Sequence, residues 1–320
     1  ISPAFVTEDA YFTNETEFNR AVLGVYAKLS DYYWYNGGQN NGTHPVFLLP
    51  GDDITTSDQE EFEQFAQLQP SSARITYFYR TSYRIIARAN TVIQKVDNVA
   101  DNIYTTPNLK NYHKGEALFL RGLAMFNLWN YFGTAPLVTE RVSSTDQTTP
   151  PSSTGTQLLD QAILDFTEAA ALLPATWDAA NRGRATANSA RGMLGKALVF
   201  RGTVNNATSD FTAAITAFNS ITGVSLTPKF DDNHAADTEN NEESLFEFQA
   251  SQAFAVDNVW LENDFDNAVG SISAFWGYYD NNFALFGKSR FSATTKLQDA
   301  FDPGDPRLQL TLDPANRNVN

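Results

Sequence analysis

The sequence predicts a mainly α-helical protein, a tetratricopeptide-like scaffold of helix pairs with long loops and a few short strands. Three observations support this fold class. Apolar residues recur at helical spacing in six long segments between residues 15 and 221. The segment 115–131 is apolar on two faces, which indicates a helix with neighbours on two sides. Polar segments rich in turn-forming residues separate the helices.

The first helix shows how the boundaries are set. Val22 and Val25 lie on the apolar face of a helix over residues 15–33, and Asn14 or Thr16 can cap its start. The remaining helices follow the same period. The expected helices cover residues 15–33, 75–99, 109–131, 157–173, 186–201 and 211–221.

A degenerate repeat supports the stacking of these helices in pairs. The second helix of a tetratricopeptide repeat places an aromatic residue four positions after Ala, with Pro further on. Ala162, Phe166 and Pro174 follow this order, and Ala214 with Phe218 repeats the spacing. The alternative, a set of unrelated amphipathic helices, stays open at this point.

The connecting segments have their own patterns. Residues 36–58 are dense in Gly, Asn, Asp and Thr and predict a long polar loop. Residues 243–249 alternate like a strand, and residues 294–301 fit a last short helix. We expect one domain over residues 1–320. Its helical scaffold covers residues 1–222, and a loop-rich ligand-binding region covers residues 223–320.

Composition and charge exclude several classes of protein. Lys and Arg total 22 against 37 Asp and Glu, and the net charge of −15 argues against a nucleic-acid partner. The chain has no Cys, which excludes thiol nucleophiles, disulfides and Cys-ligated zinc, and its three His share no metal-ligand spacing. No apolar run reaches the length of about 18 residues expected of a membrane-spanning helix.

Motifs of catalysis do not occur in the sequence. GxSxG, HExxH, GxGxxG and the phosphate-binding GxxxxGK[ST] pattern are all missing. We therefore expect no catalytic residues, no metal and no cofactor. A glycoside hydrolase stays open, because the spacing of its two carboxylates cannot be read from a sequence.

Aromatic residues in polar loops are the best candidates for binding. The runs YYWYNGGQNN (32–41) and SAFWGYYDNNFALFG (273–287) place Trp and Tyr among Asn, Asp and Gly. Such rings match the flat C–H faces of a sugar, and their amide and carboxylate neighbours match its hydroxyls, although the rings could also only fix the loops on the scaffold. The candidate ligand-binding residues are Trp34, Tyr35, Asp53, Trp260, Trp276, Tyr278 and Tyr279.

Asp53 and its neighbour Asp52 have further interpretations. They lie in the polar segment PGDDITTSD and could coordinate calcium or accept hydrogen bonds from sugar hydroxyls. A solvated turn or a helix cap explains them as well.

The run ALFLRGLAMFNLWNYFGTAPLVTE (117–140) resembles the signature helix of the SusD/RagB family, the surface glycan-binding lipoproteins of Bacteroidetes-type bacteria. Other family landmarks appear in the family's order. They are RIIARANTVIQKVDN (84–98), GRATANSARGMLGKALVFRG (183–202), SLFEFQ (244–249) and TKLQDAFDPGDPR (295–307). The resemblance covers essentially the whole chain.

The resemblance implies a non-enzymatic protein that binds a glycan in a shallow site formed by loops. It also implies a partner, a TonB-dependent outer-membrane transporter of the SusC type, over which the protein closes as a lid. A surface-exposed position in the outer membrane would follow from an N-terminal lipid anchor. Peptide binding, as in RagB-type relatives, is the alternative within the same fold.

Two features depart from the family. The chain ends soon after Arg307, where family members usually continue, and it is either a fragment or a natural short form. The acylated Cys expected near the mature N-terminus is missing, so that the anchor is implied by the family alone.

Overall fold

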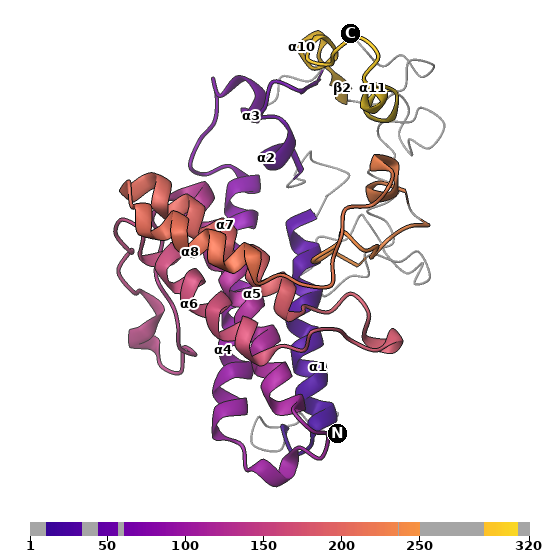
Figure 1. The fold of residues 1–320 in the computed structure, drawn as a ribbon. Helices are drawn as coiled ribbons and strands as arrows, with labels where there is room; N and C mark the ends of the chain where they lie inside the picture. The colour runs from indigo at the N-terminus through magenta and orange to yellow at the C-terminus, as the bar shows by residue number, and fades with distance from the viewer. Residues whose placement is uncertain (1–10, 34–43, 57–60, 236, 250–290, 313–320) are drawn as a thin grey trace, which may run out of the picture. The chain divides into compact units, whose positions relative to one another are not determined.

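The computed structural model describes residues 11–33, 44–56, 61–235, 237–249 and 291–312 (Figure 1). The chain folds into two compact units. The scaffold unit comprises the described residues within 1–28, 82–227 and 236–248. The second unit comprises those within 29–81, 228–235 and 249–320. The expected boundary at residue 222 stays a prediction.

The scaffold unit is a stack of helices. Helix α1 packs against α5, α5 against α6, α6 against α7 and α7 against α8. This order confirms the predicted helical scaffold. The α-helices are α1 (Glu15–Tyr26), α4 (Ala73–Asn98, of which residues 82–98 belong to this unit), α5 (Leu109–Phe132), α6 (Gln157–Leu172), α7 (Ala187–Asn205) and α8 (Thr208–Asn219). The short 3-10 helices are η3 (Asp101–Ile103), η4 (Thr145–Thr148) and η5 (Ala179–Asn181).

Helix α1 begins where the sequence predicts. The Asn14 side chain caps it by accepting a hydrogen bond from the Glu17 N–H at 3.1 Å. The predicted apolar face is fully buried at Val22 and Val25. The chain then tightens into the 3-10 helix η2 (Ala27–Tyr33), so that the whole predicted range is helical.

Helix α5 is buried on both predicted faces. It ends at Gly133, which has φ of +70° and donates its N–H to the Trp129 carbonyl at 2.8 Å. Tyr131, at the end of the segment predicted to be apolar on two faces, is 41% exposed. The buried members of the two predicted faces are Ala117, Phe119, Leu120, Ala124, Phe126 and Leu128.

Glycines let neighbouring helices approach closely. A Cβ at Gly122 would lie 2.9 Å from a ring carbon of Phe166, so that α5 and α6 can meet at this distance only without a side chain there. Between α7 and α8, a Cβ at Gly195 would lie 2.4 Å from a ring carbon of Phe218, so that the ring would have to move to make room for it. Phe166 is fully buried, whereas Phe218 is 42% exposed.

A buried ion pair joins α5 to α6. Arg121 donates to both carboxylate oxygens of Asp165, at 2.8 and 2.6 Å, with side-chain exposures of 7% and 2%. Its Nη1 also donates to Asn90 Oδ1 at 2.8 Å and to the Thr139 carbonyl at 2.9 Å. One guanidinium therefore ties α4, α5, α6 and the segment after α5 together.

The repeat pattern is confirmed in α6 and partly in α8. Ala162, Phe166 and Ala169 are fully buried, as expected for the inner face of a helix pair. Ala214 is buried too, but Phe218 covers Gly195 at the seam between α7 and α8 and keeps much of its ring in solvent.

The second unit has a small apolar core and a two-stranded sheet. Strand β1 (Ile54–Thr56) pairs antiparallel with β2 (Phe291–Ala293), with Ile54 opposite Ala293. Val46, Leu49 and Phe62 form the core. Its helices are α2 (His44–Leu48), α3 (Glu61–Gln64), residues 73–81 of α4, α10 (Thr295–Asp299), α11 (Pro306–Thr311) and the 3-10 helix η6 (Phe230–Asn233).

Two predictions about connecting segments need correction. The segment 36–58 is not all loop, because it contains α2 and β1. Residues 243–249 are not a strand, and the adjacent side chains of Leu245 and Phe246 pack on two different helices, α7 and α5. The Leu245 carbonyl accepts the Ser189 hydroxyl of α7 at 2.6 Å, and the Phe246 ring meets that of Phe119 in α5 at 5.0 Å. The predicted helix at 294–301 is α10, capped by Thr294.

Candidate functional site

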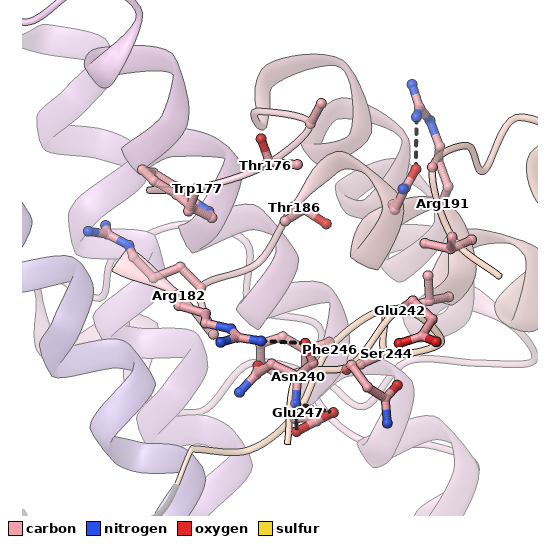
Figure 2. Close-up of a pocket in the computed structure, with 18 of the residues that line it drawn as sticks. Thr176, Trp177, Arg182, Thr186, Arg191, Asn240, Glu242, Ser244, Phe246 and Glu247 are labelled. Carbon is pink, nitrogen blue, oxygen red and sulfur yellow. Dashed lines mark hydrogen bonds between the residues drawn. The ribbon is translucent and has the colours of Figure 1, made fainter. Parts of the chain in front are cut away.

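A pocket of about 430 Å³, with both polar and apolar lining, opens on the scaffold unit (Figure 2). We call it the loop pocket. It is lined by residues within 175–191, which connect α6 to α7 and begin α7, within 222–224 after α8, and within 240–247. Its volume falls in the range of small-molecule binding sites, about 300–1,000 Å³.

The side chain of Trp177 is held rigidly at the edge of the loop pocket. Its indole N–H donates to the Ala185 carbonyl at 2.8 Å. The guanidinium carbon of Arg184 lies 4.6 Å from the centre of the ring, and the Tyr112 ring meets it edge-on at 5.5 Å. The ring is only half-buried, so that part of its apolar surface stays accessible.

Arg184 connects this ring to the core. It donates to both oxygens of the fully buried Glu116, each at 2.6 Å, and to Asn19 at 2.8 Å. The Tyr26 hydroxyl donates to Glu116 at 2.9 Å and accepts the Ala185 N–H at 2.9 Å. Burial, followed by the charge of Glu116, raises the pKa of Tyr26 well above its usual range, so that this hydroxyl stays protonated.

Hydrogen bonds across the loop pocket join its two sides. Arg182, from the loop before α7, donates to the Asn240 carbonyl at 2.8 Å. The Asn240 N–H in turn donates to both carboxylate oxygens of Glu247 at 2.9 Å (Figure 2). The loop and the 240–247 segment therefore form one connected wall.

Several polar groups of the pocket remain available. Among the described residues, no hydrogen bond involves the hydroxyls of Thr176 and Ser244 or the carboxylate of Glu242. Arg191 donates through Nη1 to Asn188 at 3.1 Å. The pocket thus offers donors and acceptors of both neutral and charged kinds.

Asp53, a predicted binding residue, lies in the second unit. Its side chain is exposed, and its carbonyl accepts the Thr294 N–H at 2.9 Å next to the β1–β2 pairing. The neighbouring Asp52 carboxylate forms an ion pair with Lys296, which lowers the pKa of Asp52 through a hydrogen bond and its charge. The role of Asp53 in binding stays a prediction.

The other predicted binding residues lie outside the described residues. They are Trp34, Tyr35, Trp260, Trp276, Tyr278 and Tyr279.

Sequence reasoning missed Trp177. It lies in the run TWDAANRGRAT, an aromatic residue among Asn, Asp and Gly, and this is the same signal that selected the other aromatic loops. Its partner across the pocket, the 240–247 segment, is more than 60 residues away in the chain, and nothing in the sequence joins the two.

The described part of the chain contains no group of three or more His, Asp or Glu side chains placed to hold a metal ion. In the same residues, no helix is long and apolar enough to cross a membrane.

Comparison with known proteins places the chain in a family. A family model described as starch-binding, associating with the outer membrane, matches residues 36–199, just over half of the chain. The chain belongs to the SusD/RagB family. A SusD-like protein of Formosa agariphila is 22% identical over 197 residues, which cover 57% of this chain and 36% of that protein.

Solved structures share the fold. A SusD superfamily protein from Bacteroides vulgatus has a TM-score of 0.67 at 22% identity, over 93% of this chain and 65% of that one. A laminarin-binding SusD-like protein has a TM-score of 0.63 at 23% identity, over 75% of this chain and 52% of that one. The chain therefore spans about a third of the curated relative's length and between half and two thirds of these two structures.

Proposed function

We propose that the protein binds a glycan at the cell surface without catalysing a reaction on it. The observation that carries this proposal is the match to the SusD-like family over residues 36–199, with its description of starch binding and outer-membrane association. The laminarin-binding relative supports the same ligand class.

The principal contacts come from the aromatic loops. Trp276 and Tyr278 occupy a polar, glycine-containing segment where no helical period requires an aromatic residue, and Asp53 and Trp34 lie in comparable segments. An aromatic face would stack on the C–H face of a pyranose, and neighbouring amides would bind its hydroxyls.

Mutation of Trp276 tests this assignment. Truncating a ring that fills a core costs roughly 3–5 kcal/mol of stability, whereas truncating an exposed platform costs binding. We expect Trp276→Ala to keep nearly the parental melting temperature and to lose most glycan affinity in isothermal titration with maltoheptaose or laminarihexaose. Tyr278→Ala should act more mildly in the same direction. A large fall in melting temperature, or parental affinity, would show that the ring belongs to the scaffold.

The protein would act as the lid subunit of a TonB-dependent transporter of the SusC type, held at the outer membrane by a lipid anchor. This role comes from the family and is proposed here for the whole protein. Affinity purification from the native outer membrane should recover a β-barrel transporter together with the protein. Recovery of the protein alone would contradict the lid role.

Two alternatives have direct tests. Release of reducing ends from polysaccharide would indicate a glycoside hydrolase, the enzymatic alternative. Saturable binding of short peptides, with no binding of the oligosaccharides, would indicate a RagB-type peptide binder.

A further inference from the structure

We infer that the loop pocket of the scaffold unit is a second carbohydrate subsite, one that takes a neutral sugar and works independently of the aromatic loops. The inference rests on the proposed function for its ligand class, but on different residues. None of the described residues that line the pocket is among the aromatic-loop candidates or Asp53.

The first argument is the rigidity of the aromatic wall. Trp177 is fixed by its hydrogen bond to the Ala185 carbonyl and by Arg184 over its ring, and Arg184 is itself fixed by the buried Glu116. A ring already held in place loses little conformational entropy when a ligand stacks on it. The contacts with the scaffold core therefore hold a half-buried indole in place, with apolar surface on which a ligand can stack.

The second argument is the chemistry of the available polar groups. Each sugar hydroxyl donates one hydrogen bond and accepts others, so that a sugar needs donors and acceptors side by side. The carboxylate of Glu242 can accept from two hydroxyls, Arg191 can donate, and the hydroxyls of Thr176 and Ser244 can do either. With the indole of Trp177, the pocket matches both kinds of surface that a pyranose presents.

The third argument is charge, which selects a neutral ligand over an anion. Three arginines line the pocket, at positions 182, 184 and 191. Arg184 is neutralised by Glu116, and the carboxylates of Glu242 and Glu247 balance the other two. The carboxylates would repel an acidic sugar or a phosphate, and the pocket has no excess of positive charge to offset this repulsion.

The experiment uses 19F NMR of protein labelled with 5-fluorotryptophan. The chain has five Trp, and Trp177→Phe assigns the resonance of Trp177. The labelled Trp276→Ala protein is titrated with methyl glycosides of glucose, galactose, mannose and xylose, with maltoheptaose and laminarihexaose, and with a tripeptide mixture. We expect at least one sugar to shift the Trp177 resonance saturably.

A matched pair of variants assigns the polar contact. Glu242→Gln removes one of the two carboxylates that line the pocket and should raise the apparent Kd of that sugar about tenfold, because hydrogen bonds to a charged acceptor are the stronger ones. Glu239→Gln makes the same chemical change at an exposed residue that does not line the pocket and should leave Kd within about twofold.

The outcomes separate the subsite from the proposed function. If no sugar shifts the Trp177 resonance while the parental protein binds oligosaccharide through Trp276, the subsite is wrong and the proposed function stands. If sugars shift Trp177 and truncation of Trp276 changes nothing, the subsite stands and the assignment to the aromatic loops is wrong. A shift by tripeptides alone, or equal Kd values for the two Glu variants, overturns the subsite.

Discussion

The buried pair of Arg121 and Asp165 gives the sharpest prediction about stability. Asp165→Asn keeps the shape of the side chain but leaves the guanidinium without its counter-charge, at a site where both side chains are less than a tenth exposed. Breaking a buried pair in this way costs about 3–5 kcal/mol of the free energy of unfolding. The measurement is guanidinium chloride denaturation followed by circular dichroism at 222 nm.

The control is a more exposed pair in the same unit. Asp160 is 43% exposed and pairs with Arg201, which also binds Asp210. Asp160→Asn should therefore cost less than about 1 kcal/mol. Equal effects of the two substitutions would refute the reasoning.

A double variant tests the cause of the loss. In Arg121→Met with Asp165→Leu, the unpaired charge is removed, and apolar groups fill the space. We expect this protein to be more stable than Asp165→Asn. It should still be less stable than the parent, because Asn90 and the Thr139 carbonyl lose the hydrogen-bond donor that Arg121 supplies. A double variant less stable than the single one would contradict an origin in the buried charge.

Three further predictions concern packing and pH. Gly122→Ala should destabilise the protein by about 1–3 kcal/mol in chemical denaturation because its Cβ meets a fully buried ring, whereas Gly195→Ala should be close to neutral because the half-exposed ring there can turn away. Burial lowers the pKa of His113 to about 4 from its usual 6.5, so that its ring resonance in NMR should stay unchanged from pH 8 to about 5; a midpoint near 6.5 would contradict its burial. Hydrogen bonds, chiefly from the Thr106 N–H, lower the pKa of Glu15 to about 2. The ionised Glu15 carboxylate therefore stabilises the folded protein above about pH 4.5, and this stabilisation is lost as the pH falls towards 2. The melting temperature of Glu15→Gln should decline less over this pH interval than that of the parent.

The periodicity of the sequence was sufficient to predict the helices. Each helix is formed by hydrogen bonds between residues four apart and carries apolar residues at a similar spacing. Residues close in the sequence therefore determine where each helix begins and ends. The family signature in α5 was recognisable for the same reason, since its glycines, its apolar faces and its terminal Gly133 lie in one continuous run.

The strand predicted at residues 243–249 shows where local pattern misleads. Phe246 and Phe248 do alternate with Glu247 and Gln249, but Phe246 packs against Phe119 of α5, and the adjacent Leu245 lies against Gly192 of α7. A period of two indicates that alternate side chains face different surroundings, and it does not identify the surface that they face.

Only the tertiary structure decided which distant residues meet. Arg121 pairs with Asp165, Ile54 with Ala293, and the loop carrying Trp177 closes against the 240–247 segment. The sequence determined the helical scaffold because helices form from near neighbours in the chain. It left the buried ion pair, the small sheet and the loop pocket undetermined, because these depend on contacts between segments whose separation in sequence carries no information about their distance in space.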